Sequence, residues 1–229
     1  MKCAIMQPHY MPWSGYFNLI ASVDKFVFYD DVQFEKQSWQ NRNRILLNHQ
    51  SFFITVPSHR EHLEQPIHLI RIEDGSNWRE KQIRLLQQTY AKHPFSSDML
   101  EIAKIVLDKS NTLLADLDIK IIEAVCSKLG LSKTFVRSSS LNILGDRSDR
   151  LINICKALDC DEYLSPPGSR DYIEEDGKFR DNPIKLRFQN FEPQPYVQKN
   201  EQAFVSHLSF LDVVANLGWA KTLDYITPR

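Results

Sequence analysis

The 229-residue sequence has almost no net charge and no long apolar run. Its 28 basic and 29 acidic residues leave a formal charge of -1, which disfavours a general electrostatic attraction to nucleic acid. No apolar stretch approaches the length of a membrane span, and no signal-peptide pattern opens the chain. The sequence therefore predicts a cytoplasmic protein without a membrane span.

Signatures of metal binding and of disulfides are also missing. The four cysteines form no C-x-x-C pair, and no group of cysteines and histidines has zinc-finger spacing. His59 and His62 are spaced like metal ligands but lack a third partner at a familiar spacing, so no metal-ligating residues are predicted. We expect reduced thiols, most of them buried in apolar segments.

The common catalytic fingerprints are absent as well. The sequence contains no Walker A pattern, no G-x-G-x-x-G and no G-x-S-x-G elbow. It also contains no internal repeat and no long linker rich in Pro, Gly or Ser. A nucleotide, if one is bound, must therefore be held by a different arrangement.

What the sequence does contain is an alternation of strand and helix patterns. The predicted strands are 3–6, 25–29, 44–47, 51–57, 66–72, 134–137, 160–165 and 185–189. The predicted helices start near Gly15 and cover 79–90, 98–107, 112–129, 149–158 and 209–226, the last with a possible break after Gly218. This order predicts an α/β fold with a mostly parallel, Rossmann-like sheet in a single domain, 1–229. Residues 76–130 form a helical insertion, and 205–229 form a C-terminal helical segment.

Polar and aromatic residues follow the first predicted strand at once. In an open α/β sheet, ligands bind outside the carboxyl ends of the strands, so Gln7, His9 and Tyr10 become site candidates. Gly15 opens the next helix, where a ligand can approach the backbone and free amides favour a phosphate. His9 could bind a phosphoryl oxygen or act as an acid or base; the alternative is a surface or packing histidine. Tyr16 follows in the same stretch.

The second predicted strand ends in the pair Asp30 and Asp31. Either carboxylate could hold a metal, a ribose or an amine, and the alternative is a turn or helix cap. Neighbouring strand residues point to opposite faces, so we expect only one of them in the site. Lys36 and Arg42 follow in a segment rich in donors around Trp39, which could also be a solvated loop.

A second candidate region lies in the third quarter of the chain. Arg150 starts a predicted helix, where the helix dipole disfavours a cation, so its position suggests an anionic partner. After the strand that ends at Ser165, the sequence enters a sharp loop. There Gly168, Ser169 and Arg170 offer a flexible backbone, a hydroxyl and a planar cation, a combination suited to phosphate. Tyr172 closes this loop.

These residues resemble a known family. MQPHYMPWSGYF at 6–17, KQSWQNRN at 36–43 and SDRLINICKALDCDEYLSPPGSRDYI at 148–173 are similar to the WbqC-like family, and the resemblance covers nearly the whole chain. The family usually reads SGPGGRDYL where this chain has SPPGSRDYI, so Pro166 and Ser169 replace two glycines. The resemblance implies a role in bacterial O-antigen or other surface-polysaccharide biosynthesis, with glycine or related aminoacyl transfer onto a sugar as the suggested reaction.

The opening unit also looks like a nucleotidyltransferase-like fold, the fold of pantothenate synthetase, which makes an amide through an acyl-adenylate. That resemblance implies ATP or another nucleotide as cofactor, with Mg²⁺ as an optional ion, and places a second phosphate-binding loop at 165–170. The chain departs from the motif at Tyr16, which stands where the second histidine of a T/H-x-G-H motif belongs. A phenol cannot become a cation at neutral pH, so His9 is expected to take that role.

Together these observations and resemblances predict a transferase or ligase that acts on a nucleotide-linked amino sugar. The catalytic candidates are His9, Asp30, Asp31 and Arg170. The nucleotide-binding candidates are Gln7, Tyr10, Gly15, Tyr16, Lys36, Arg42, Arg150, Ser165, Gly168, Ser169 and Tyr172. The alternative is a non-catalytic nucleotide-sugar-binding or scaffold protein of the same pathway. RNA binding is disfavoured unless an aminoacyl-tRNA is the acyl donor.

Overall fold

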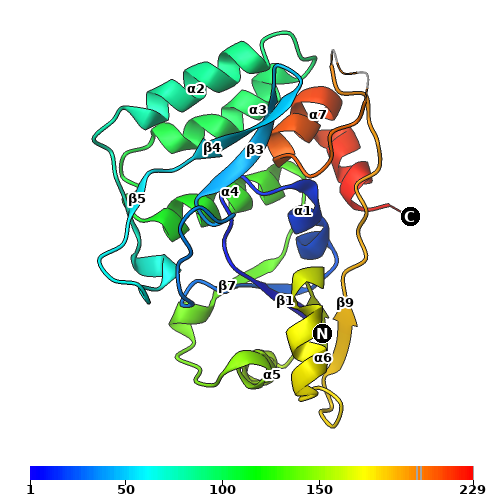
Figure 1. Ribbon diagram of the computed structural model, residues 1–229. Helices are drawn as coiled ribbons and strands as arrows, with labels where there is room; N and C mark the ends of the chain where they lie inside the picture. The colour runs from blue at the N-terminus through cyan, green and yellow to red at the C-terminus, as the bar shows by residue number, and fades with distance from the viewer. Residues whose placement is uncertain (200, 202, 229) are drawn as a thin grey trace.

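A computed structural model describes residues 1–199, 201 and 203–228. Its central sheet has five parallel strands in the order β7-β2-β1-β8-β9 (Figure 1). These strands are β1 (Lys2–Met6), β2 (Lys25–Phe28), β7 (Thr134–Arg137), β8 (Glu162–Ser165) and β9 (Lys185–Phe188). The predicted α/β fold with a parallel, Rossmann-like sheet is confirmed.

The sheet is buried on both faces, and its middle strands are mostly apolar after a charged first residue. Along β1, Cys3 and Ile5 point to one hydrophobic cluster, whereas Ala4 points to the other, as the two-residue period of a strand requires. Three of the five residues of β1 are fully shielded from solvent. The strand at the centre of the sheet is thus the one that leads into the predicted site.

Helices cover both faces, and the chain changes direction beside β1. Helices α1 (Ser14–Ala21) and α4 (Leu114–Lys128) pack on one face, and α5 (Arg147–Ala157) and α6 (Arg170–Asp176) pack on the other (Figure 1). The chain first builds outward through β2 and β7, then returns to place β8 and β9 on the other side of β1. The gap between β1 and β8 is therefore the topological switch point, where such folds bind ligands.

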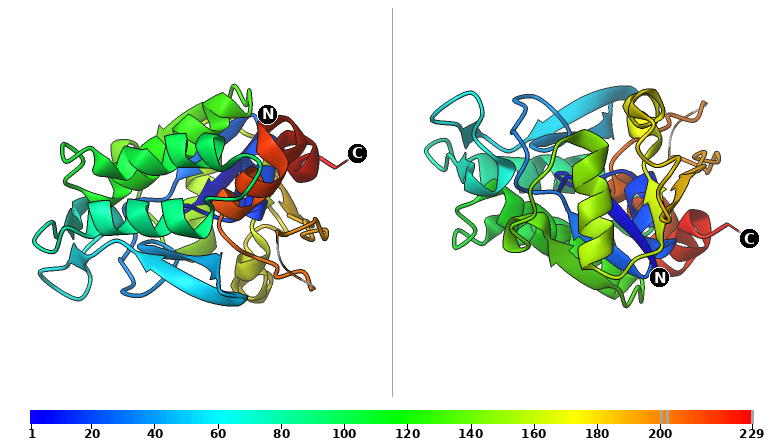
Figure 2. Two further views of the ribbon diagram at one scale, coloured as in Figure 1. Left: turned by 90° about the horizontal axis from the view of Figure 1, so that it is seen from above. Right: turned by 90° about the horizontal axis from the view of Figure 1, so that it is seen from below.

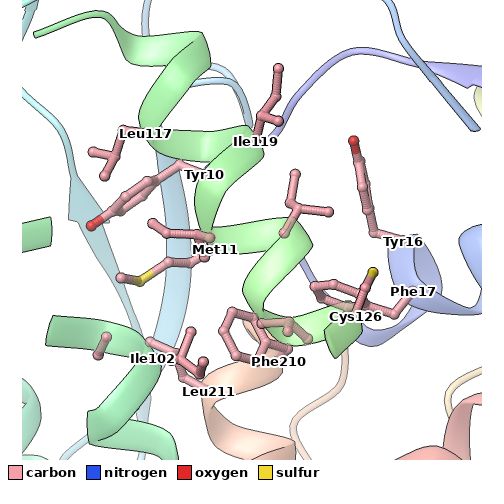
Figure 3. Close-up of a cluster of buried hydrophobic side chains, with 14 of the residues drawn as sticks. Tyr10, Met11, Tyr16, Phe17, Ile102, Leu117, Ile119, Cys126, Phe210 and Leu211 are labelled. Carbon is pink, nitrogen blue, oxygen red and sulfur yellow. The ribbon is translucent and has the colours of Figure 1, made fainter. Parts of the chain in front are cut away.

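A second layer of helices covers α4. It contains α2 (Trp78–Thr89), α3 (Ser96–Ala103) and α7 (Phe210–Ile226). Figure 3 shows Met11, Phe17 and Phe210 around α4, and the ring centres of Phe17 and Phe210 lie 5.4 Å apart. Helix α7 bends at Gly218 (φ 71°), the position where the sequence predicts a break, and a Cβ there would lie 2.8 Å from the ring of Phe95.

A β-hairpin stands apart from the central sheet. It consists of β3 (Arg42–Leu47) and β4 (Gln50–Thr55), joined by Asn48 and His49, which both have positive φ. The backbone N–H of Tyr10 donates to the carbonyl of Trp39 at 3.0 Å, so the segment leading into the hairpin is bound to the loop after β1. Figure 2 shows the hairpin on the same side of the molecule as the start of α6.

The predicted strand at 66–72 is wrong. Residues 66–72 are a 3-10 turn (Ile67–Leu69) followed by the two-residue β6 (Arg71–Ile72), which pairs with β5 (Ser58–His59). The turn buries Ile67 and Ile70, three residues apart, which an alternating strand would place on opposite faces. Helix α2 starts at Trp78, one residue before the predicted start at 79.

The predicted loop at 166–172 also contains regular structure. A 3-10 turn (Pro167–Ser169) leads directly into α6, so Arg170 begins a helix instead of lying in a flexible loop. The predicted helical insertion, 76–130, contains α2, α3 and α4, and the C-terminal segment contains α7; its last residue, Arg229, lies outside the described residues. None of the described helices has the length and apolarity needed to cross a membrane.

The core contains one carboxyl group without a partner. Asp118 on α4 is fully buried, and neither of its carboxyl oxygens has a hydrogen-bond partner among the described residues. Burial raises the pKa of this group well above its ordinary value of 3.8, so the folded protein holds it protonated. Its favourable contribution to stability is complete below pH 3.8 and is lost as the pH rises through the raised pKa.

We therefore expect Asp118→Asn to remove part of the pH dependence of stability. The amide cannot ionise, so the variant should gain stability relative to the wild type as the pH rises from about 5 to about 8. Urea unfolding at both pH values measures this difference. A constant difference across that range would show that the carboxyl of Asp118 is already ionised in the folded protein at the lower pH, so that its pKa is not raised.

Candidate functional site

A cavity of about 480 Å³ opens at the carboxyl ends of β1 and β8. Six aromatic side chains form part of its wall, together with apolar side chains such as Ile5 and Leu151. The aromatic side chains are Trp13, Tyr16, Tyr29, Trp39, Tyr163 and Tyr172. Its position is the topological switch point of the sheet, and its lining is typical of a small-molecule site.

The fold brings the two predicted loops together at this cavity. Parallel pairing places Cys3 of β1 beside Tyr163 of β8, so the segments that follow the two strands meet at the same edge of the sheet. The predicted residues that line the cavity are Gln7, His9, Gly15, Tyr16, Gly168, Ser169 and Tyr172. The predicted residues outside its lining are Tyr10, Asp30, Asp31, Lys36, Arg42, Arg150, Ser165 and Arg170.

Asp30 is engaged in an internal network. It is fully buried, accepts from Arg137 Nε at 2.6 Å, and accepts from the backbone N–H and the hydroxyl of Ser139 at 3.0 and 2.9 Å. Burial works to raise the pKa of the carboxyl, but the bonds from Ser139 and Arg137 together hold it below its ordinary value. The carboxylate of Asp30 is therefore a stable anion, and its hydrogen bonds link the end of β2 to the end of β7.

Asp31 and Arg150 form an ion pair at the side of the cavity. The guanidinium of Arg150 lies 5.0 Å from the centre of the ring of Tyr29, which lines the cavity. The anionic partner expected for Arg150 is thus a side chain of this protein, and the pair holds an aromatic wall in place.

Other predicted residues are used by the fold in similar ways. Tyr10 is fully buried, and its hydroxyl contacts the side chain of Gln82. The hydroxyl of Ser165 lies 2.5 Å from that of Ser169, so it orients a residue of the cavity wall. Arg170 pairs with Glu174 at 3.2 Å on the surface of α6.

The two remaining cations lie on the outside of the molecule. Lys36 is exposed. The guanidinium of Arg42 lies 4.2 Å from the centre of the ring of Phe53 on the outer face of the hairpin. Both belong to the donor-rich segment, which forms a surface beside the cavity.

Gly15 is required for a different reason from the one predicted. A Cβ atom on this residue would lie between 2.2 and 2.6 Å from three atoms of the Trp13 ring. The space above the start of α1 is therefore occupied by the indole of Trp13, which also packs against His207 with ring centres 4.7 Å apart. Gly168 has no atom within 4 Å of the position that a Cβ would take.

The structure adds cavity residues that the candidate set lacks. Among the described lining residues, Arg44 is the one side chain with a permanent positive charge, and it donates to the carbonyl of His207 at 3.1 Å. Gln189 follows β9 as Gln7 follows β1, so the same strand-end rule could have selected it. Trp39 and Asn43 reach the cavity because their segment docks on the loop after β1, a contact without a sequence signal.

His9 lines the cavity beside Tyr16, with ring centres 5.3 Å apart. Burial lowers the pKa of the imidazole to about 4, so the ring is neutral at pH 7 and can accept one proton. The hydroxyl of Tyr16 donates to the backbone carbonyl of Gln7 at 3.0 Å, so it holds the loop rather than a ligand. His9 and His207 are the two imidazoles of the described lining, and we take His9, which directly follows the central strand, as the candidate general base.

We expect the imidazole of His9 to titrate near pH 4 in the free protein. Histidine proton chemical shifts measured by NMR across the acid range report this pKa directly, and His9→Gln identifies the resonance. A ligand that places a phosphate beside the ring should raise the pKa, because a nearby negative charge favours the imidazolium. A free-protein pKa near that of an exposed histidine, about 6.5, would contradict the buried environment.

The described residues do not fit a magnesium site. The carboxylates proposed for it, Asp30 and Asp31, are already bound by Arg137 and Arg150 and lie outside the cavity lining. No cluster of three His, Cys, Asp or Glu side chains within 1–199, 201 and 203–228 is arranged to hold a metal ion. Mg²⁺ prefers carboxylate and phosphate oxygens, and no described residue of the lining is a carboxylate.

Comparison with known proteins identifies relatives by sequence. No solved structure matches this chain. An uncharacterised protein of Mycobacterium tuberculosis (strain ATCC 25618 / H37Rv) is 33% identical over 227 residues, which cover 98% of this chain and 97% of that protein. Residues 7–223 match the WbqC-like protein family, a span that includes both loops of the cavity. The chain therefore belongs to the WbqC-like protein family.

Proposed function

We propose that this protein binds a nucleotide-linked amino sugar in the cavity between β1 and β8 and transfers an acyl or aminoacyl group to its amino nitrogen. The observation that carries the proposal is an aromatic cavity with a single permanent cation, placed at the switch point of a Rossmann-like sheet. Membership of the family supports a place in bacterial surface-polysaccharide biosynthesis. We propose a cytoplasmic location for the same reason.

The lining favours a nucleotide sugar over free ATP. Aromatic faces such as those of Trp39 and Tyr172 can stack on a base or on the apolar face of a sugar. Arg44 can neutralise one phosphate, whereas the indole of Trp13 occupies the space above the start of α1. A triphosphate carries more negative charge than Arg44 can match. ATP with Mg²⁺ is therefore the less favoured cofactor.

The proposed chemistry assigns one catalytic group. The amine nitrogen attacks the acyl carbon, the bond from that carbon to the donor breaks, and the proton leaves the nitrogen for the neutral imidazole of His9. Of the four catalytic candidates only His9 lines the cavity. We assign Asp31 a positioning role, through its pair with Arg150, and place Asp30 and Arg170 in the scaffold.

The same observation supports a second candidate. If His9 does not transfer protons, the cavity still suits a non-catalytic protein that binds a nucleotide sugar within a biosynthetic complex.

An aminoacyl-tRNA donor would have to approach the outer face of the hairpin, where Trp39 is 42% exposed beside Arg42 and Phe53.

Binding and turnover separate the two candidates. Thermal unfolding with UDP-N-acetylglucosamine, UDP-glucosamine and ATP measures which ligand stabilises the protein. We expect a larger stabilisation by the UDP-sugars than by ATP. ATP–pyrophosphate exchange with glycine then tests an adenylate route, and acylation of UDP-glucosamine by activated glycine tests direct transfer. Turnover that His9→Ala abolishes supports the enzyme, whereas stabilisation without turnover supports the binding protein. No stabilisation by any nucleotide or UDP-sugar would overturn both.

A further inference from the structure

Gln7 lines the cavity with one end of its side-chain amide already bound to the protein. Gln40, which is 1% exposed, accepts a hydrogen bond from the backbone N–H of Glu35 through its Oε1 atom at 2.9 Å. Its Nε2 atom therefore faces Gln7 and donates to Gln7 Oε1 at 2.9 Å. The part of Gln7 left for a ligand is its NH₂ group.

Gln189 lines the same cavity with the opposite end bound. Its Nε2 atom donates to the backbone carbonyl of Gly15 at 2.7 Å and to Asn18 Oδ1 at 2.6 Å. The orientation of Asn18 is fixed in turn, because its Nδ2 atom donates to the carbonyl of Ile226 at 2.7 Å. The part of Gln189 left for a ligand is its carbonyl oxygen.

Neither amide can reverse without an unfavourable contact. Turning Gln7 over would place its NH₂ group against the NH₂ group of Gln40. Turning Gln189 over would place its oxygen against the carbonyl of Gly15 and the oxygen of Asn18. Backbone atoms set both chains of hydrogen bonds, at Glu35 on one side and at Gly15 and Ile226 on the other. The polarity that each glutamine shows to the cavity is therefore fixed before a ligand arrives.

We propose that Gln7 and Gln189 determine ligand specificity with opposite and fixed polarity. Gln7 donates to a carbonyl or phosphoryl oxygen of the ligand, and Gln189 accepts from a hydroxyl or an N–H. The two residues follow β1 and β9, which are separated by β8, so their backbones lie about 10 Å apart and contact different parts of the ligand. This inference rests on the proposed function, because a nucleotide-linked sugar has both kinds of group at that separation.

The charge of the lining refines the substrate class. No described lining residue is a carboxylate, so the cavity has no counter-charge for an ammonium group. A neutral oxygen such as that of Gln189 accepts from an uncharged amine, an amide N–H or a hydroxyl equally well. The cavity is therefore suited to an amino sugar in its uncharged form, which is also the form that can attack an acyl group.

Gln40 allows the polarity of Gln7 to be reversed without changing Gln7. Gln40→Glu keeps the acceptor for Glu35 and, as a carboxylate, presents an oxygen to Gln7, which then turns over and shows its own oxygen to the cavity. Because burial favours the protonated carboxyl, which could still donate to Gln7, binding is compared at about pH 7 and about pH 9, and the loss should grow with pH. Gln40→Met, of similar size, removes the hydrogen bond and imposes no polarity. With UDP-N-acetylglucosamine as the probe in isothermal titration calorimetry, we expect Gln40→Glu to weaken binding about tenfold or more and Gln40→Met about threefold or less.

Three results would overturn the inference. Binding by Gln40→Glu as tight as that of the wild type would show that Gln7 does not donate to the ligand. Equal weakening of binding by both variants would show that Gln40 acts only through packing. Gln189→Met should also weaken binding, and an unchanged affinity would remove Gln189 from the site.

Failure of the proposed function gives a different result. In that case the wild type itself does not bind UDP-N-acetylglucosamine. The polarity of the two glutamines is then tested in the free protein by nuclear Overhauser contacts. One contact is expected between the side-chain NH₂ protons of Gln40 and the side chain of Gln7. The other is expected between the side-chain NH₂ protons of Gln189 and α1. Absence of these contacts overturns the inference without any ligand.

Discussion

Replacing Arg79 with methionine is expected to destabilise the protein by about 3–5 kcal/mol. The side chain is 1% exposed, and its guanidinium lies between α2 and the chain that leads into α4. Nε donates to Asp74 at 2.6 Å and Nη2 donates to the same carboxylate at 3.1 Å. The remaining donors reach the backbone carbonyls of Val106, Asp108 and Asn111.

The expected loss is large because the partners of Arg79 stay in place. Methionine fills a similar volume but donates no hydrogen bond, so the carbonyls of Val106 and Asn111 lose their donors in a buried setting. For a chain of this size the change corresponds to a fall of about 10 °C in Tm. Urea unfolding followed by circular dichroism measures it.

Arg84 on the same helix provides the matched control. Its side chain is exposed, so Arg84→Met should change the unfolding free energy by less than about 0.5 kcal/mol. Equal losses for the two variants would mean that the effect reflects a general property of α2. A small loss for Arg79→Met would show that the five hydrogen bonds do not hold the helical insertion together.

Gly15→Ala is expected to damage the cavity and the fold together. The added methyl group would meet atoms of the Trp13 ring at 2.2 to 2.6 Å, so the indole must leave its place above the start of α1. Overpacking of this kind costs about 1–3 kcal/mol. Because Trp13 and Gly15 both line the cavity, affinity for a UDP-sugar should fall by about tenfold or more, which is about 1.4 kcal/mol.

Gly168 lies in the same cavity and makes the comparison specific. No atom lies within 4 Å of the position of its Cβ, and its φ is not positive, so Gly168→Ala should leave the unfolding free energy unchanged within about 0.5 kcal/mol. Thermal unfolding and titration calorimetry on both variants test the contrast. If Gly15→Ala is as stable as Gly168→Ala and binds as well as the wild type, the contact between Trp13 and Gly15 is not essential.

The fold was predictable because its signals are local. Short strand patterns such as 3–6 and 134–137 become strands of the central sheet, and the alternation of strands with helices is enough to predict parallel pairing. The rule that ligands bind at strand ends then selects Gln7 and His9, which do line the cavity. The same rule could not tell which strand ends form the cavity and which do not.

The sequence could not indicate which side chains interact when the two residues lie far apart along the chain. Asp30 is separated from Arg137 by 107 residues, and Asp31 from Arg150 by 119, so no spacing pattern indicates that these charges neutralise one another. Such pairs look like free catalytic groups in the sequence. The hairpin shows the same limit of sequence-based prediction. Asn43 is held at the cavity by a hydrogen bond from its side chain to the carbonyl of Tyr10, a contact that no sequence pattern indicates.

A crystal structure of the protein with UDP-N-acetylglucosamine tests the central claim most directly. We predict electron density for the ligand between the loops after β1 and β8, with a ring against Trp13 or Tyr172 and a phosphate near Arg44. The molecule also has a polar hollow of about 540 Å³ between the hairpin tip and the end of α2, lined by His93 and Lys199 among others. Ligand in that hollow, with the cavity between β1 and β8 empty, would contradict the assignment.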